Sequence, residues 1–156
     1  MIKMLRLDER LIHGQVAFAW TNSLGADCIF VINDDVAENK LRMTSLKLAA
    51  PGGVKFVAKS VDAAIELLNG NKTDKYKLFL IVDNTADALR LVKEVKGVNH
   101  VNLGNMKVKE GTRALTPSIA VTETDMENIR EMLAEGAEVE CRAVPTDKKI
   151  MVETLI

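Results

Sequence analysis

The chain has 156 residues, of which 47% are hydrophobic and 28% charged, as expected for one soluble globular domain with a single good core. Its 21 basic and 22 acidic residues leave a formal net charge of −1, so no overall basic field exists to hold nucleic acid. No apolar run approaches the roughly 20 residues that span a bilayer, and charges at positions 3, 6, 8, 9 and 10 interrupt any signal-peptide stretch, so we expect a cytoplasmic protein.

Short apolar or β-branched runs, which predict strands, alternate with longer segments of helical period. Three N-capping signals precede helical segments: Asn33 or Asp34, Ser60, and the stretch from Thr122 to Asp125. In chain order we expect a strand at 2–7, a helix at 14–22, a strand at 28–32, a helix from 34 towards 49, a strand at 54–58, a helix at 61–68, a strand at 77–82, a helix from 84 or 85 that closes at 97, a strand at 100–103, an irregular polar stretch through 117, a helix at 126–134 and a strand at 139–144.

This alternation predicts an α/β fold, a three-layer α/β/α sandwich with one mostly parallel sheet of about six strands and right-handed crossovers. Neither an internal repeat nor a linker divides the chain, so we expect residues 1–156 to form a single domain. The two cysteines, Cys28 and Cys141, stand in unrelated contexts and are expected to be buried, reduced thiols. Ligands of such sheets bind beyond the carboxyl ends of the strands, so the loops of interest are 8–14, 33–35, 83–85, 104–109 and 145–148.

The first of these loops contains the only unusual chemistry, with Arg10 and His13 three residues apart between a strand and a helix. Neutral imidazole is well populated near pH 7 and is a good nucleophile. A phosphoryl group on the ring would carry about two negative charges, and the guanidinium of Arg10 and the free N–H groups at the helix start are suited to bind them. Gly14 leaves room for the approaching group, and Gln15 offers a further donor. The loop is therefore suited to a phosphorylated His13, with Arg10, Gly14 and Gln15 binding the phosphate, although the spacing alone favours a structural histidine.

The carboxylates of Asp8 and Glu9 would repel a phosphate unless they pair with a cation or hold the imidazole by its second nitrogen. We expect Asp8 to orient Arg10 or His13, and Glu9 to be a surface charge. His100, the only other histidine, is expected to be hydrogen-bonded in or beside a strand, so no multi-histidine metal site is predicted. The chain has neither of the two common glycine-rich phosphate-binding motifs, which argues against a nucleotide-dependent enzyme.

The segment RLDERLIHGQV, from Arg6 to Val16, closely resembles the phosphorylation loop of the IIB components of sugar phosphotransferase systems, in the mannose/fructose/sorbose family. Similar segments fall in family order at 87–91, 101–106, 136–139 and 144–147, so the resemblance covers nearly the whole chain. It implies the strand order 3-2-4-1-5-6, which would set Asn84 and Thr85 beside the His13 loop as further phosphate-binding residues. Many relatives have a proline in that second loop where this chain has Thr85 or Ala86.

The resemblance also implies an activity, that of a protein-Nπ-phosphohistidine–sugar phosphotransferase (EC 2.7.1.-). In this family the histidine at the position of His13 accepts a phosphoryl group, usually on Nδ1, from a phosphohistidine of the IIA component. It passes the group to a sugar bound by the membrane components IIC and IID, and the arginine at the position of Arg10 contacts the phosphate. The family implies peripheral association with the transporter and no cofactor or metal beyond the phosphohistidine itself; relatives are often homodimers.

The residues alone leave one alternative open. A lone histidine near a helix start is usually structural, so the chain could be a non-catalytic regulatory or small-ligand module on the same fold, with a structural His13. Such a module would form no phosphohistidine. Phe18, Trp20 and Met106 are candidates for a docking face, although core packing is favoured for Phe18 and Trp20.

Overall fold

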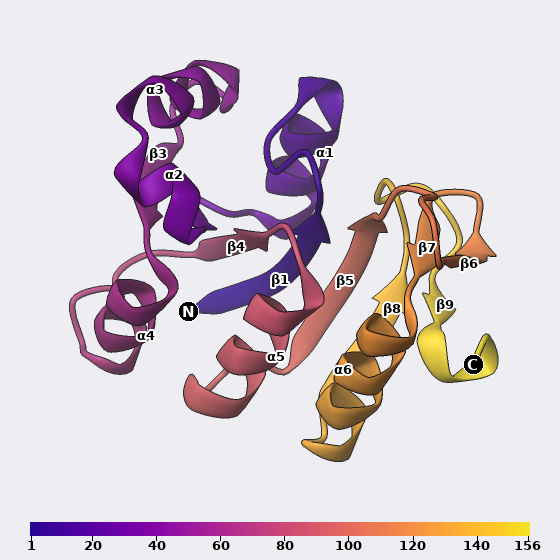
Figure 1. The fold of residues 1–156 in the computed structure, drawn as a ribbon. Helices are drawn as coiled ribbons and strands as arrows, with labels where there is room; N and C mark the ends of the chain where they lie inside the picture. The colour runs from indigo at the N-terminus through magenta and orange to yellow at the C-terminus, as the bar shows by residue number, and fades with distance from the viewer.

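The computed structural model describes all of residues 1–156 and shows a central sheet between two layers of helices (Figure 1). The sheet has the order β3-β2-β4-β1-β5-β8-β9, and a separate hairpin pairs β6 with β7. The strands are β1 (Ile2–Asp8), β2 (Cys28–Ile32), β3 (Lys55–Lys59), β4 (Leu78–Val82), β5 (His100–Asn105), β6 (Arg113–Thr116), β7 (Ile119–Val121), β8 (Glu138–Cys141) and β9 (Ile150–Met151). The helices are α1 (Gly14–Leu24), α2 (Asp34–Glu38), α3 (Lys40–Ala49), α4 (Val61–Asn69), α5 (Thr85–Glu94), α6 (Glu123–Ala134) and the short 3₁₀ helix η1 (Val152–Thr154). None of these helices has the length and apolar character needed to cross a bilayer.

The predicted sandwich and the predicted order of its first six strands are confirmed. The pairings from β3 through β8 are all parallel, and every residue of β2 and β4 is buried, because helices cover both faces of a parallel sheet. The sheet has a seventh strand, β9, which pairs antiparallel with β8.

Each face of the sheet has its own core. The larger one lies under α4, α5 and α6, and the smaller one lies under α1, α2 and α3. Successive residues of a strand point to opposite faces, so Leu5 and Leu7 of β1 enter the larger core and Met4 enters the smaller one. Arg6 and Asp8 share the face of Met4 and therefore lie on the α1 side of the sheet.

Five of the six α-helices begin with a side chain that accepts a backbone N–H of the first turn. The capping residues are Asn33 for α2, Asn39 for α3, Ser60 for α4, Asn84 for α5 and Thr122 for α6. The caps predicted at Asn33, Ser60 and Thr122 are thereby confirmed, and Asp125 completes a capping box with Thr122. Among the six α-helices, only α1 has no side-chain cap.

Two predictions about local structure are wrong. The single helix expected at 34–49 is divided into α2 and α3, because Asn39 is extended and its carboxamide caps the second helix by accepting the amide of Arg42 at 3.0 Å. The stretch expected to be irregular through 117 contains β6, whose hairpin partner β7 is joined to the end of β5 by a bridge between Met106 and Ile119. Both features are short, and short elements leave little periodicity in a sequence.

Candidate active site

The loop between β1 and α1 is held against the sheet by two apolar side chains. Leu11 and Ile12 are 2% and 4% exposed and belong to the smaller core. Leu11 has φ +58, a left-handed conformation that costs a non-glycine residue roughly 1–2 kcal/mol, and its amide donates to the carbonyl of Asp8 at 2.9 Å. This turn brings His13 back over the carboxyl end of β1, next to Asp8.

Asp8 is fully buried and is the acceptor on which the site converges. Its Oδ2 accepts hydrogen bonds from Arg6 Nε and Nη2, at 3.3 and 3.0 Å, and lies 2.9 Å from Nε2 of His13. Its Oδ1 accepts the backbone amide of Arg10 at 2.9 Å and the carboxamide of Asn105 at 3.4 Å. The structure therefore brings Asp8 together with the imidazole of His13 and with the backbone of Arg10, whereas the guanidinium of Arg10 is not bound to it.

His13 occupies the N-cap position of α1 without capping it, because its side chain makes no hydrogen bond to the first turn. The side chain is 16% exposed, so part of the ring reaches solvent. The amides at the start of α1 have no side-chain acceptor, and the first turn contains no acidic residue. An uncapped helix start with its dipole favours an anion, and here it lies beside an imidazole.

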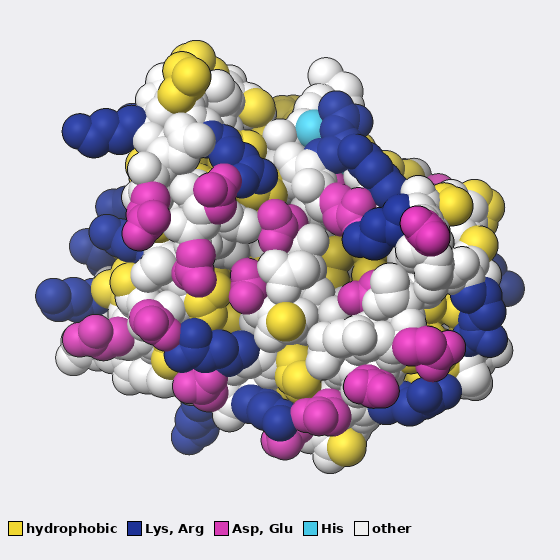
Figure 2. All heavy atoms as spheres, in the orientation of Figure 1, with side chains coloured by type: hydrophobic (Ala, Val, Ile, Leu, Met, Phe, Trp, Pro, Cys, Tyr) yellow, Lys and Arg dark blue, Asp and Glu magenta, His cyan; other side chains and the backbone are white.

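The exposed side chains around the loop include two cations, Arg10 and Lys109. Arg10 and Gln15 are exposed, and neither side chain forms a hydrogen bond or ion pair. Glu9 is 22% exposed; it accepts the amide of Lys107 at 3.1 Å and lies 3.9 Å from Nζ of Lys109. Glu9 is thus half-buried and ties the loop after β5 to the His13 loop. Figure 2 shows Lys and Arg side chains next to exposed histidine surface in the region that α1 occupies in Figure 1.

The side chains of Asn84 and Thr85 are engaged elsewhere. Thr85 is 2% exposed; its hydroxyl donates to Asp125 at 2.7 Å and accepts from Asn128 at 3.0 Å, both on α6. Asn84 caps α5 and donates to the carboxylates of Asp83 and Asp87. Although β4 lies next to β1, neither side chain hydrogen-bonds to the His13 loop.

The loop after β4 is also acidic, which disfavours a phosphate. Burial raises the pKa of Asp87, and the charges of Asp34 and Asp83 raise it further, against the hydrogen bond from Asn84. The structure thus does not bring the side chains of Asn84 and Thr85 together with His13, and their binding of phosphate stays a prediction.

A family model described as "PTS system sorbose subfamily IIB component" matches residues 2–156. The chain belongs to this family of IIB components of the phosphotransferase system. It is 32% identical to a probable phosphotransferase enzyme IIB component of Streptococcus pyogenes, over 100% of this chain and 99% of that protein. It is 35% identical to the mannose-specific EIIAB component of Escherichia coli, where it covers 48% of the longer protein. The crystal structure of the IIBSor domain of the sorbose permease from Klebsiella pneumoniae matches with a TM-score of 0.92 at 30% identity, over 97% of this chain and 93% of that one.

Sequence reasoning missed one residue of the candidate site, Arg6. It is 2% exposed and donates to Asp8 and also to Oδ1 of Asn102, at 2.7 Å. The available signal was an arginine inside an otherwise apolar strand, two residues before Asp8 and hence on the same face. The contacts of Glu9 with Lys107 and Lys109 were also missed, because the sequence does not show how that later loop folds back.

The three candidates for a docking face differ in exposure. Trp20 is 1% exposed and donates from Nε1 to the carbonyl of Ala143 at 3.0 Å, so its predicted core position is confirmed. Met106 is 3% exposed and is also part of the core. Phe18 is 52% exposed, so the core position favoured for it is wrong.

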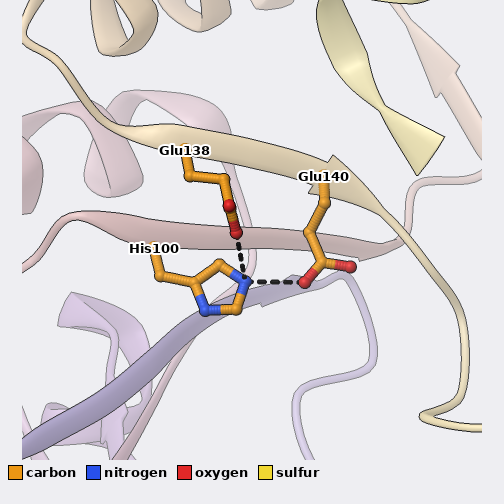
Figure 3. A group of neighbouring side chains, drawn as sticks. All are labelled: His100, Glu138 and Glu140. Atoms are coloured by element: carbon orange, nitrogen blue, oxygen red, sulfur yellow. Dashed lines mark hydrogen bonds and ion pairs between the residues drawn. The ribbon is translucent and has the colours of Figure 1, made fainter. Parts of the chain in front are cut away.

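A second group of ionisable side chains lies along β5 and β8 (Figure 3). His100 Nε2 lies 2.6 Å from Glu140 and 3.2 Å from Glu138, which confirms that His100 is hydrogen-bonded at a strand. Both carboxylates already have cationic partners, because Arg142 binds Glu140 through Nε and Nη2 and Lys149 binds Glu138 at 2.8 Å. These ion pairs account for the group, and we assign no metal to it.

The two cysteines are free and buried as predicted. Burial raises the pKa of each thiol to about 11, so neither Cys28 nor Cys141 is a reactive thiolate near neutral pH.

Proposed function

We propose that this IIB component carries a phosphoryl group on His13, which it accepts from a phosphorylated IIA protein and gives to a sugar during uptake through IIC and IID membrane components. The observation that carries the proposal is the position of one imidazole, bound to Asp8 through Nε2 and placed at the only uncapped α-helix start. The relative named EIIAB supports a IIA protein as the partner.

The hydrogen bond to Asp8 selects the reactive nitrogen. Because the carboxylate of Asp8 is paired with Arg6, we treat it as ionised, and an ionised carboxylate can only accept hydrogen bonds. We therefore assign the ring proton of His13 to Nε2, which leaves the lone pair on Nδ1. The ring can attack through Nδ1 without first losing a proton.

Phosphoryl transfer needs positioning and charge stabilisation more than covalent assistance. Nδ1 of His13 would form the new N–P bond in line, while the N–P bond in the donor breaks and its electron pair returns to the donor imidazole. The backbone amides at the start of α1 and the side chains of Arg10 and Gln15 would hold the three equatorial oxygens. No proton moves in this step, since Nε2–H remains bound to Asp8.

In the second step a sugar hydroxyl would attack the phosphorus and release its proton to water, while the N–P electron pair would return to Nδ1. The carrier would work at the cytoplasmic side of the membrane and dock transiently on the transporter, so that its contacts are small and reversible. Relatives named for mannose and for sorbose indicate that sugar selectivity is not set by the features this chain shares with them.

The proposal is tested by labelling with phosphoenolpyruvate, the general phosphotransferase proteins and a IIA protein. We expect an acid-labile, base-stable phosphoryl label on the wild-type chain and its complete loss in His13→Ala. His100→Gln is the matched control, because it removes the only other imidazole and should keep the label. A label that persists in His13→Ala would end the proposal.

A further inference from the structure

Arg6 lies beneath the candidate site and touches no part of the expected phosphate. Its side chain is buried between β1, β5 and α1, and its three guanidinium nitrogens all have partners. Nε and Nη2 donate to Oδ2 of Asp8, and Nη1 donates to Oδ1 of Asn102 at 2.7 Å and to the carbonyl of Arg142 at 3.3 Å. The guanidinium also lies over the ring of Trp20, 5.6 Å from its centroid.

The space that Arg6 occupies exists because residue 104 is a glycine. A Cβ built on Gly104 would overlap the Arg6 guanidinium at Cζ, Nη1 and Nη2. The backbone of Gly104 is not in the left-handed region, so the need for glycine here comes from this close approach and not from φ. The missing side chain of Gly104 thus leaves a slot in β5, and the guanidinium of Arg6 fills that slot.

We propose that Arg6, seated in the slot opened by Gly104, is a positioning residue for phosphoryl transfer that keeps Asp8 a hydrogen-bond acceptor and thereby keeps Nδ1 of His13 unprotonated. The inference rests on the proposed function and extends it to two residues that never meet the phosphoryl group. Burial lowers the pKa of Arg6, while the charge and hydrogen bonds of Asp8 oppose that shift.

Without Arg6, Asp8 would be a buried carboxylate with no cationic side chain bound to it. Asp8 is fully buried, and an unpaired carboxylate in such a place favours its neutral form. A protonated Asp8 would donate to Nε2 of His13, and the ring proton would then reside on Nδ1. The nitrogen that must attack phosphorus would have no free lone pair.

The chain offers a matched control for each of the two residues, Arg6 and Gly104. Arg142 also lies over Trp20, at 4.9 Å, but its guanidinium binds Glu140 in place of Asp8, so Arg142→Met removes a comparable cation and keeps the backbone carbonyl that accepts from Arg6. Gly52 has no atom within 4 Å of a built Cβ and no positive φ, so Gly52→Ala repeats the glycine substitution in open space. Arg6→Lys keeps the charge and tests for partial rescue.

The experiment measures two quantities in each variant. The ¹⁵N chemical shifts of the His13 ring report the tautomer, and the rate of phosphorylation by phosphoramidate, a small donor that needs no protein partner, reports reactivity. Arg6→Met and Gly104→Ala should each shift the ring from the Nε2–H to the Nδ1–H tautomer and slow phosphorylation roughly 10- to 100-fold, by analogy with the loss found when the hydrogen-bond partner behind a metal-ligating histidine is removed. Arg142→Met and Gly52→Ala should leave both quantities unchanged, and Arg6→Lys should lie between the wild type and Arg6→Met.

The outcomes separate this inference from the proposed function. Folded Arg6→Met or Gly104→Ala protein with the wild-type tautomer and rate would overturn the positioning role while leaving His13 as the acceptor. If these variants do not fold, the tautomer of His13 in the wild-type protein is the test. A predominant Nδ1–H tautomer would contradict the positioning role. An Nε2–H tautomer, together with partial activity in Arg6→Lys, would support it. A wild-type protein that shows the Nε2–H tautomer but is never phosphorylated would refute the proposed function alone.

Discussion

The carboxylate of Asp8 joins three separate parts of the chain. It accepts from Arg6 within its own strand, from the amide of Arg10 and the ring of His13 in the following loop, and from Asn105 at the end of β5. Buried polar groups are satisfied in this way because an unpaired one is costly. The consequence is that the orientation of a partly exposed imidazole is set by groups inside the fold, which is the preorganisation that transfer chemistry requires.

Arg10 presents the opposite case, an exposed guanidinium with no partner. We expect Arg10→Ala to change the free energy of unfolding by no more than about 0.5 kcal/mol, as is usual for an unpaired surface side chain. It should slow phosphoryl transfer to His13 roughly 100-fold, because one donor to the phosphoryl oxygens is lost. The rate is measured by mixing the protein with a phosphorylated IIA protein and quenching the transfer reaction at successive times. Arg130, an exposed arginine on α6, gives the matched control Arg130→Ala, and a rate near wild type in Arg10→Ala would show that Arg10 does not bind the phosphate.

Among the elements, α1 differs from the other helices by its start. The other five α-helices cover their first amides with an Asn, Ser or Thr side chain, whereas α1 leaves them open behind a loop pinned by Leu11 and Ile12. Capping by a side chain typically contributes about 1 kcal/mol to stability. The loss of that contribution at α1 is consistent with a helix start kept available for an anion.

The role of Leu11, which anchors the His13 loop, can be tested by comparing its substitution with that of a leucine elsewhere in the core. Leu11→Ala should lower the free energy of unfolding by about 2–5 kcal/mol, as large-to-small core substitutions do, and should also slow phosphoryl transfer, because the turn that places His13 is loosened. Leu91→Ala, in the larger core on the opposite face of the sheet, should cost similar stability without slowing transfer. Urea unfolding and transfer rates measured well below the melting temperature give the comparison. Equal transfer rates in the two variants would contradict a positioning role for the loop anchor.

At the scale of the whole molecule, the buried charged and polar side chains lie in a row on one face of the sheet. The α1 side carries a polar row formed by Arg6 and Asp8 on β1, Asn102 on β5, Glu140 on β8 and Arg142 just after it, while the opposite face is the larger apolar core. The row begins under the candidate site and ends in the His100 group, where β5 and β8 begin (Figure 3). Arg6 and Asp8, which support the site, therefore also join β1 to β5 through Asn102 and Asn105.

The far end of this row makes stability depend on pH. Burial alone would raise the pKa of Glu140, but its hydrogen bonds with His100 and Arg142 outweigh burial and hold the pKa below its usual 4.5. A carboxyl with a depressed folded-state pKa stabilises the fold above its unfolded pKa, and this contribution is lost as the pH falls through the folded value. The free energy of unfolding should therefore decrease as the pH is lowered below 4.5. Urea titrations in this range should give a shallower decrease for Glu140→Gln, and an unchanged slope in that variant would contradict the assignment.

Much of this architecture could be predicted from the sequence because its signals are local. The apolar runs of β2 and β4, the caps at Ser60 and Thr122, and the His13 motif all lie within a few consecutive residues. The hairpin of β6 and β7 and the edge strand β9 are short and gain their order from neighbours distant in sequence. The role of Arg6 depends on the register that sets it against Asn102 and Gly104, and no local pattern contains that register.

The central claim is that His13 accepts a phosphoryl group through Nδ1 while Nε2 stays bound to Asp8. The most direct test is NMR spectroscopy of the ¹⁵N-labelled chain after phosphorylation by phosphoenolpyruvate, the general phosphotransferase proteins and a IIA protein. The account predicts a ³¹P coupling to Nδ1 of His13 and a proton retained on Nε2. Phosphorus bonded to Nε2 of that ring, or found on any other residue, would contradict it.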